Sequence, residues 1–219
     1  MHSFVDTNVS IGFMFSIDPL NNKSMSVFGE YEYIFWSNCV KDESEKVFKN
    51  KRKILIEFFK DLSNNLKPED FQNFTYDDLK KYIYRNYSKN KKRNQILSSL
   101  GKFWSNYVDE MFPTYDSFIN SVNNCLSDLK ISVYSRKNEW ESTVLLSELR
   151  TEMYIEIKNK LNSFKVHSPD DKIILDAHDH NLRNEFLLDF ITFDKDCCDA
   201  ASRIEDFSFN KVKGISDYL

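Results

Sequence analysis

The chain has 219 residues, of which 41% are apolar and 15% aromatic, so it suits one globular domain and is too rich in core-forming side chains to be disordered throughout. Its formal net charge of −4 argues against a protein coated by nucleic acid, because such proteins carry a basic surface. Gly and Pro occur four times each, too seldom for a fold built on tight β-turns, which predicts a mostly helical chain.

The four cysteines follow neither a zinc-knuckle nor a disulfide pattern. No stretch of about 18 consecutive apolar residues occurs, and no basic region followed by a long apolar segment opens the chain. We therefore expect a reduced, soluble, cytoplasmic protein that makes no use of a membrane.

The first predicted element is a short apolar strand over residues 3–6, which ends at Asp6, and a second short apolar segment covers residues 11–15. Residues 24–37 fit a strand or the start of a helix, and their periodicity does not decide between the two. From Val40 to Leu62 the apolar residues recur at helical spacing, which predicts one long helix.

The middle of the chain, residues 64–165, is predicted to be a series of helices separated by polar breaks. Acidic residues lie at several of the expected helix starts, where the positive end of the helix dipole favours them. The last of these segments, residues 142–164, carries an apolar stripe and is predicted to be a helix as well.

The pattern changes after Val166. Ser168 and Pro169 form a helix-start signal, and Asp171 suits the third helical position of a capping box. A buried strand is predicted over residues 186–193, followed by a short helix and a last strand.

Acidic residues stand at the ends of these elements. Asp6 and Asp194 follow predicted strands, and Asp171 lies at a helix start. In open parallel sheets, functional residues gather at the carboxyl ends of the strands and at the helix starts beside them. A buried carboxylate needs a cationic partner, and several carboxylates that converge favour capture of Mg²⁺ or Mn²⁺.

Four short motifs, in this order, resemble those of the PIN-domain nucleases: FVDTNV, SNCVKDESEKV, SPDDKIILDAHDHNL and FITFDKD. In that family, acids meet at the carboxyl end of a parallel sheet and hold one or two divalent ions. Carried over by position, the resemblance makes Asp6, Glu43, Asp171 and Asp194 the four catalytic and metal-binding acids.

The resemblance also leaves alternatives open around these acids. Asp196 is an additional candidate metal ligand, and Asp176 competes with Asp171 for the third place because it too precedes FITFD by a suitable distance. Asn8 and Thr192 resemble polar residues that orient a carboxylate or a water molecule from behind the ligands.

The fold class implied by the resemblance is α/β and helix-dominated, with a PIN-like three-layer arrangement around a small, mostly parallel central sheet. The whole chain is expected to be one PIN-like domain. Residues 1–60 and 166–219 supply its core, and residues 61–165, far longer than the family's usual connection, form a helical insertion.

The function implied is a metal-dependent endoribonuclease that hydrolyses single-stranded or unpaired RNA, with a role as toxin, defence or RNA-processing enzyme left open. The alternatives are a non-catalytic module that binds RNA or protein, and a DNA-directed nuclease that uses the same acids. Besides RNA, an antitoxin, another protein partner or a second copy of the chain stays open. A basic run just beyond Glu43 is a weak candidate for holding backbone phosphates: Lys46, Lys49, Lys51, Arg52 and Lys53.

Overall fold

The computed structural model describes residues 1–71, 73–87, 91–147, 153–184 and 187–218, and it divides into two compact units. One, here called the sheet unit, comprises Met1–Phe13, Asn22–Lys46 and Asn138–Leu219. The other, the helical unit, comprises Met14–Asn21 and Val47–Lys137. Each is described by itself below.

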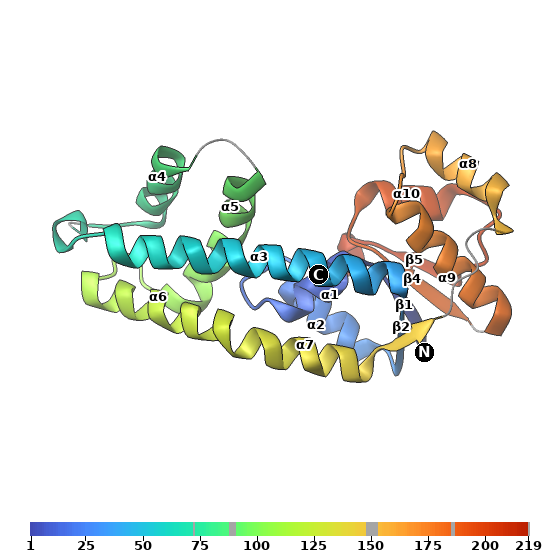
Figure 1. The fold of residues 1–219 in the computed structure, drawn as a ribbon, viewed down its shortest axis with the longest axis horizontal. Coiled ribbons are helices and arrows are strands. Elements are labelled where there is room, and N and C mark those ends of the chain that lie inside the picture. The colour runs from blue at the N-terminus through green and yellow to red at the C-terminus, as the bar shows by residue number, and fades with distance from the viewer. Residues whose placement is uncertain (72, 88–90, 148–152, 185–186, 219) are drawn as a thin grey trace. The chain divides into compact units, whose positions relative to one another are not determined.

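Helices predominate over strands along the described chain (Figure 1). In chain order the elements are β1 (His2–Val5), α1 (Thr7–Met14), α2 (Asn21–Glu30), β2 (Tyr33–Ser37), α3 (Asn38–Asn65), η1 (Pro68–Phe71), α4 (Tyr76–Asn86), α5 (Lys91–Phe103), η2 (Trp104–Val108), α6 (Tyr115–Lys130), α7 (Ser132–Thr143), β3 (Leu145–Ser147), α8 (Ile155–Ser163), α9 (Asp170–Asn184), β4 (Leu188–Ile191), α10 (Lys195–Arg203), β5 (Lys211–Lys213) and η4 (Ile215–Asp217).

The described strands form one sheet in the order β3-β2-β1-β4-β5, and every neighbouring pair is parallel. The chain moves outwards from β1 through β2 to β3, then returns to the other side of β1 for β4 and β5. The expected helix-dominated α/β fold with a small parallel sheet is therefore confirmed.

Helices cover both faces of this sheet. Phe4 and Phe35 are in register and share a face, and both rings contact His180 of α9, with Phe35 the closer at 4.3 Å between ring centroids. The opposite face presents Trp36, whose ring lies 6.1 Å from that of Trp140 near the end of α7. Burial on both faces explains why β2, YIFWS, is almost continuously apolar.

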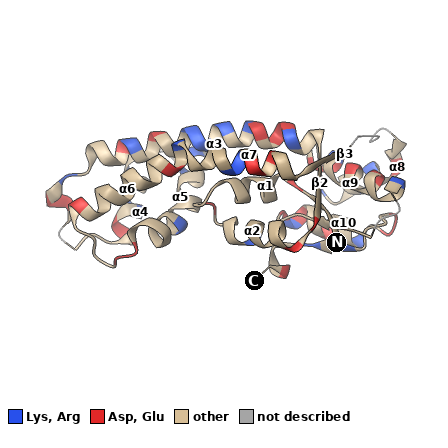
Figure 2. Cartoon of the chain, turned by 90° about the horizontal axis from the view of Figure 1, so that it is seen from below, with Lys and Arg blue, Asp and Glu red and all other residues tan. Residues whose placement is uncertain are grey.

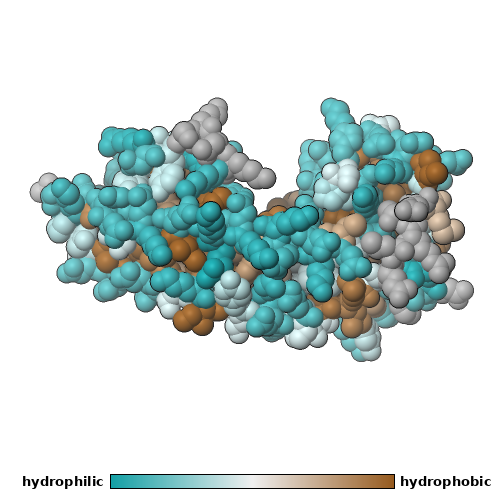
Figure 3. Space-filling view, viewed as in Figure 1, coloured by the Kyte–Doolittle hydropathy of each residue, from teal (hydrophilic) through white to brown (hydrophobic). Residues whose placement is uncertain are grey.

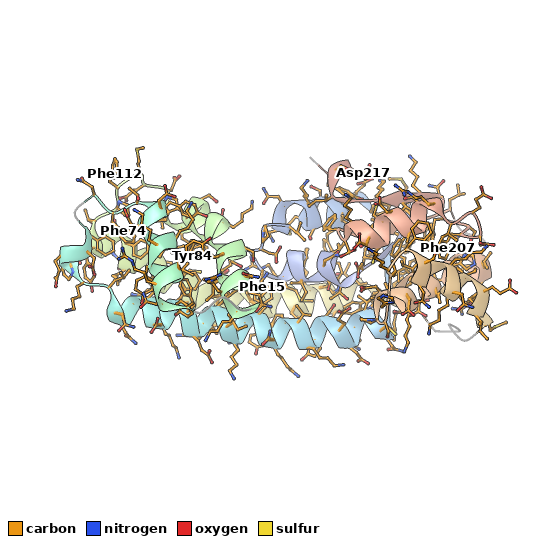
Figure 4. All side chains as sticks on the ribbon, turned by 90° about the horizontal axis from the view of Figure 1, so that it is seen from above. Phe15, Phe74, Tyr84, Phe112, Phe207 and Asp217 are labelled. Atoms are coloured by element: carbon orange, nitrogen blue, oxygen red, sulfur yellow. The ribbon has the colours of Figure 1, made fainter. Side chains whose placement is uncertain are left out.

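Helix α9 packs across β2 and β4, α10 packs against β5 and α9, and α8 packs against α9 (Figure 1). Phe207, labelled in Figure 4, packs its ring on His178 of α9 at 5.3 Å between centroids. The loop that follows α10 thereby holds α9 in place on the sheet.

An aromatic cluster forms the core of the helical unit. Phe118 of α6 is fully buried and contacts Phe74, Phe103 and Trp104. Phe74 is buried, whereas Phe112, also labelled in Figure 4, is 53% exposed. Burying several aromatic rings together supplies the main stabilisation of such a helical layer.

The observed helices and strands decide three of the expectations from the sequence. Residues 24–37, expected to be a strand or the start of a helix, contain the end of α2 and then strand β2. The apolar segment 11–15 lies largely in α1. The single helix expected over 142–164 is wrong for its described part, because Leu145 and Leu146 pair with β2 as strand β3. Pairing with β2 overrides the helical stripe there. Residues 148–152 lie outside the described chain.

The compact units divide the chain at other positions than residues 61 and 165. Besides Met14–Asn21, the helical unit contains Val47–Lys137, a segment that starts inside the uninterrupted helix α3 and ends inside α7. A continuous helix gives no break in sequence pattern at the point where its packing partners change. Residues after 137 belong with the sheet because β3 extends it and α8 packs on α9.

The surface in Figure 3 is mainly hydrophilic, with hydrophobic side chains in separate patches. Basic and acidic residues both occur along α3, as Figure 2 shows. None of the helices in the described part of the chain combines the length and the apolar character needed to cross a membrane.

Candidate functional site

The carboxyl ends of β1 and β4 mark the point where the strand order reverses. Asp6 directly follows β1, and Thr192 directly follows β4, its neighbour in the sheet. The connections from the two strands diverge at such a point and leave a crevice, which is where ligands bind in open parallel sheets. Asp6 therefore lies where this topology places a binding site.

Asp6 is a buried carboxylate, 5% exposed, that accepts three hydrogen bonds. The backbone N–H of Thr7 donates to its Oδ1 at 2.5 Å, and the side-chain Nδ2 of Asn8 and the Thr192 hydroxyl donate to its Oδ2 at 2.9 and 2.7 Å. Donors from α1 and from the end of β4 thus fix the carboxylate between the two strands.

Two threonines connect Asp6 to further acids. The Thr7 hydroxyl donates to Oε2 of Glu43 in α3 at 2.7 Å, while the Thr7 amide holds Asp6. The Thr192 hydroxyl accepts from the Asp194 amide at 3.1 Å while it donates to Asp6. Thr7 thus connects the Asp6 carboxylate to that of Glu43 through its backbone N–H and its hydroxyl, and the Thr192 hydroxyl connects the Asp6 carboxylate to the backbone of Asp194.

A fourth acid, Asp170 at the start of α9, faces the same place. Burial raises its pKa to about 6, and the charges of Glu43, Asp194 and Asp171 contribute to the rise. Burial likewise raises the pKa of Asp6 to about 7, against the lowering effect of hydrogen bonds from Thr192 and Thr7, with smaller upward effects from Asp170 and Glu43. We call Asp6, Glu43, Asp170 and Asp194 the acid cluster.

Helix starts supply part of the charge compensation. Asp194 is the N-cap of α10 and accepts from the Cys197 amide at 3.0 Å, Asp170 is the first residue of α9, and Asp6 precedes α1. Taken singly, each is a common structural arrangement at the positive end of a helix. The convergence of four acids is uncommon, because their mutual repulsion raises the free energy of the cluster. Two of the carboxylates, Asp6 and Asp170, are partly protonated near neutral pH, with burial as the larger cause.

Of the two adjacent aspartates on α9, the structure places Asp170 in the cluster, and the expected Asp171 lies outside it. Asp171 is buried and turned towards α8, where its Oδ2 lies 3.5 Å from Nζ of Lys158. Successive residues on a helix point about 100° apart, so one position decides which acid enters the cluster. Nothing in the local sequence separates the two adjacent aspartates.

The rival for that place, Asp176, is also outside the cluster. It lies further along α9 beside the Cys39 thiol, whose pKa is raised by burial and then by this carboxylate. Asp196 is exposed in the first turn of α10, and it is not among the acids that act most on Asp6 or Asp170.

Asn8 and Thr192 occupy the supporting positions that were expected of them. Besides holding Asp6, Asn8 accepts from the Phe193 amide through its Oδ1 at 3.1 Å, so it ties α1 to the end of β4. Thr7 has an equivalent role between Asp6 and Glu43, which the sequence pattern did not reveal. Its place directly after the first acid was the available signal.

The donor set of the cluster suits a hard divalent cation, since Mg²⁺ and Mn²⁺ prefer carboxylate oxygens. Within the described residues, no three Asp, Glu, His or Cys side chains are close enough to hold a metal ion as they stand. Carboxylates that repel one another turn to internal donors, as Glu43 does to Thr7 and Asp194 to the Cys197 amide. The chemistry therefore fits a cation, and Glu43 and Asp194 would have to turn from these donors to bind it.

The basic run 46–53 does not form one surface for phosphates. Lys51 is 7% exposed and pairs with Asp18 inside the helical unit, and Arg52 donates to the Leu129 carbonyl at 2.8 Å and covers the Tyr134 ring. These two cations stabilise the helical unit. Lys46 belongs to the sheet unit and is exposed; Lys49 and Lys53 are exposed in the helical unit.

Comparison of the chain with protein families, with characterised proteins and with solved structures gave no match. The functional argument therefore rests on the sheet topology and on the side chains of the acid cluster.

Proposed function

We propose that the chain is a PIN-like, metal-dependent endoribonuclease and that the acid cluster is its active site. The observation that carries the proposal is the linkage of Asp6 to Glu43 through Thr7 and to Asp194 through Thr192, at the switch point of a parallel sheet. This order of acids is the one that the resemblance to the family implies.

When bound, Mg²⁺ or Mn²⁺ would lower the pKa of a water molecule and neutralise charge on the phosphoryl oxygens of the substrate. Asp6 and Asp170 would hold the ion, and Glu43 and Asp194, of which Asp194 is exposed, would also hold it or orient the attacking water. Thr7, Asn8 and Thr192 keep Asp6 in position throughout, because their hydrogen bonds come from two different elements.

The raised pKa values make the cluster responsive to a cation. A cation replaces the protons that burial and repulsion retain on Asp6 and Asp170 near neutral pH. Uptake of the ion thus releases protons and removes the repulsion within the cluster, which is why such a cluster is better suited to binding a cation than to structural support alone.

The test is cleavage of an unstructured RNA with Mn²⁺ present. Wild-type protein should cut it, and both chelation and Asp6→Asn should abolish cutting. Asp196→Asn serves as the matched control, since it removes a neighbouring exposed carboxylate outside the cluster and should leave the rate nearly unchanged. Cutting that persists after chelation or in Asp6→Asn contradicts the proposal.

Two comparisons sharpen this test. Asp170→Asn should lose cleavage as Asp6→Asn does, whereas Asp171→Asn should retain it unless α8 is disturbed. A DNA strand of the same sequence distinguishes the RNA-directed enzyme from a DNA-directed one. RNA binding that needs no metal and occurs without turnover would instead show a binding module.

A further inference from the structure

A hollow of about 390 Å³ adjoins the acid cluster in the sheet unit. It shares Glu43 with the cluster, so a ligand in the hollow lies beside the proposed active site. The residues that line it come from the first turns of α3 and from the segment that leads into α9: Cys39, Asp42, Glu43, Lys46, Ser168, Pro169 and Lys172.

Two lysines supply positive charge to the hollow, beside the carboxylates of Asp42 and Glu43. Lys46 reaches it from α3 and Lys172 from α9, and both side chains are exposed. Neither ammonium group forms an ion pair with a carboxylate in the described part of the chain, in contrast to Lys51. Exposed ammonium groups on two sides of a hollow favour an anion such as a backbone phosphate.

The hollow also contains an acceptor. The Asp42 carboxylate repels a phosphate but accepts a hydrogen bond from a ribose hydroxyl. The 2′-hydroxyl is the group by which a protein distinguishes RNA from DNA at a given position. A hollow of this volume is large enough for a single nucleotide.

We infer that this hollow binds a ribonucleotide of the substrate strand next to the cleaved phosphodiester, with its phosphate at Lys46 and Lys172 and its 2′-hydroxyl at Asp42. This rests on the proposed function, because Glu43 is the residue that links the hollow to the site of cleavage. The inference makes Lys46 and Lys172 substrate-binding residues beside the site of cleavage.

The first experiment measures binding in an Asp6→Asn background, so that cleavage does not intervene. A fluorescent oligouridylate is titrated against this protein, against Lys46→Ala with Lys172→Ala, and against Lys60→Ala. Lys60 is an exposed lysine about four turns further along α3 that does not line the hollow, so it controls for loss of charge from the same helix.

The double variant should bind about tenfold more weakly, and its affinity should depend less on salt, by about 0.7 in the logarithmic slope for each phosphate that is no longer bound. Lys60→Ala should match its parent. Asp42→Ala should narrow the preference for RNA over DNA of the same sequence. Equal affinity and slope for the double variant and its parent, or an unchanged RNA preference in Asp42→Ala, overturns the inference.

Cys39 provides a second, independent measurement because it lines the hollow and is partly exposed. Saturating oligouridylate should slow alkylation of Cys39 without slowing that of Cys198, a comparably exposed cysteine on α10 that does not line the hollow. If RNA protects neither thiol, or both equally, the strand is bound elsewhere. Protection without any cleavage by the wild-type protein would refute the proposed nuclease activity and leave the binding site standing.

Discussion

Substitution of Asp6 by Asn should stabilise the metal-free protein above neutral pH while it removes the proposed activity. In the folded chain the pKa of Asp6 is about 7, against an ordinary value of 3.8, chiefly because the carboxylate is buried. The folded state therefore prefers the protonated form. Protonated Asp6 contributes fully to the free energy of unfolding below pH 3.8, and this contribution is lost as the pH rises to about 7.

The magnitude follows from that gap. At about 1.4 kcal/mol for each pKa unit, the cost of carrying the buried carboxylate at pH 8 is about 4 kcal/mol relative to a neutral group. Asn offers one acceptor oxygen where the carboxylate offers two, so hydrogen bonds from Thr7, Asn8 or Thr192 are lost at a cost of about 1–2 kcal/mol. The net expectation for Asp6→Asn is stabilisation by about 2 kcal/mol at pH 8.

The effect of Asp6→Asn on stability should change sign in acid. Near pH 4 wild-type Asp6 is protonated in the folded state, so burying it no longer costs the free energy of a buried charge. The only remaining effect of Asp6→Asn is then the loss of hydrogen bonds. Destabilisation by about 1 kcal/mol is then expected. Urea unfolding in a chelator at pH 4, 6 and 8 measures both signs on one pair of proteins.

Asp194→Asn is the matched control for this series. Asp194 belongs to the same cluster but is exposed and acts as N-cap of α10, a position at which Asn is about as good as Asp. Its substitution should change stability by a few tenths of a kcal/mol at most, at every pH. If Asp6→Asn is less stable than the wild-type protein at pH 8, the conclusion that burial disfavours the charged form of Asp6 is wrong.

The same hydrogen bonds, ion pairs and ring packing predict four other outcomes. Mn²⁺ should raise the free energy of unfolding of the wild-type protein more at pH 8 than at pH 5, because protons compete with the ion for Asp6 and Asp170. Mn²⁺ should not stabilise the Asp6→Asn protein, and equal stabilisation of both proteins would mean that the ion binds elsewhere. Thr7→Val should reduce the initial rate of RNA cleavage about tenfold, because it removes the hydroxyl that donates to Glu43, and Thr7→Ser should retain most of the rate. If the Ser variant cleaves no faster than the Val variant, the hydroxyl does not contribute to cleavage. Lys51→Ala should destabilise the chain by about 3 kcal/mol in urea unfolding, because it leaves Asp18 buried without its partner, and should not weaken RNA binding; weakened binding in a folded variant would return Lys51 to the RNA-binding surface. Trp140→Ala, which empties the position between Trp36 and Phe13, should cost about 3–5 kcal/mol by the same measurement, and a cost below about 1 kcal/mol would mean that this face of the sheet is not closely packed.

Local signals in the sequence were sufficient where neighbours along the chain decide the structure. The apolar residues before Asp6 and before Asp194 mark β1 and β4, and helical spacing marks α3 and α9. Because the carboxyl ends of parallel strands lie at the same edge of a sheet, these strands placed Asp6 and Asp194 at one edge, and the pairing of β1 with β4 then brought the two acids together.

Local signals in the sequence failed where residues distant along the chain decide the structure. The stripe over 142–164 is equally compatible with a helix, and pairing with β2 makes part of it strand β3. The choice between Asp170 and Asp171 depends on which side of α9 faces the sheet, and the roles of Lys51 and Arg52 depend on partners in the segments around Asp18 and Leu129.

The sequence by itself determined the helix-dominated α/β class and the placing of acids at the ends of strands and the starts of helices, since periodicity and capping are local properties of the chain. The tertiary structure alone decided the strand order, which acid of the Asp170 and Asp171 pair enters the cluster, and which lysines stay exposed. Those depend on the rotation of helices and the pairing of strands, which are fixed by burial against residues far away in the chain.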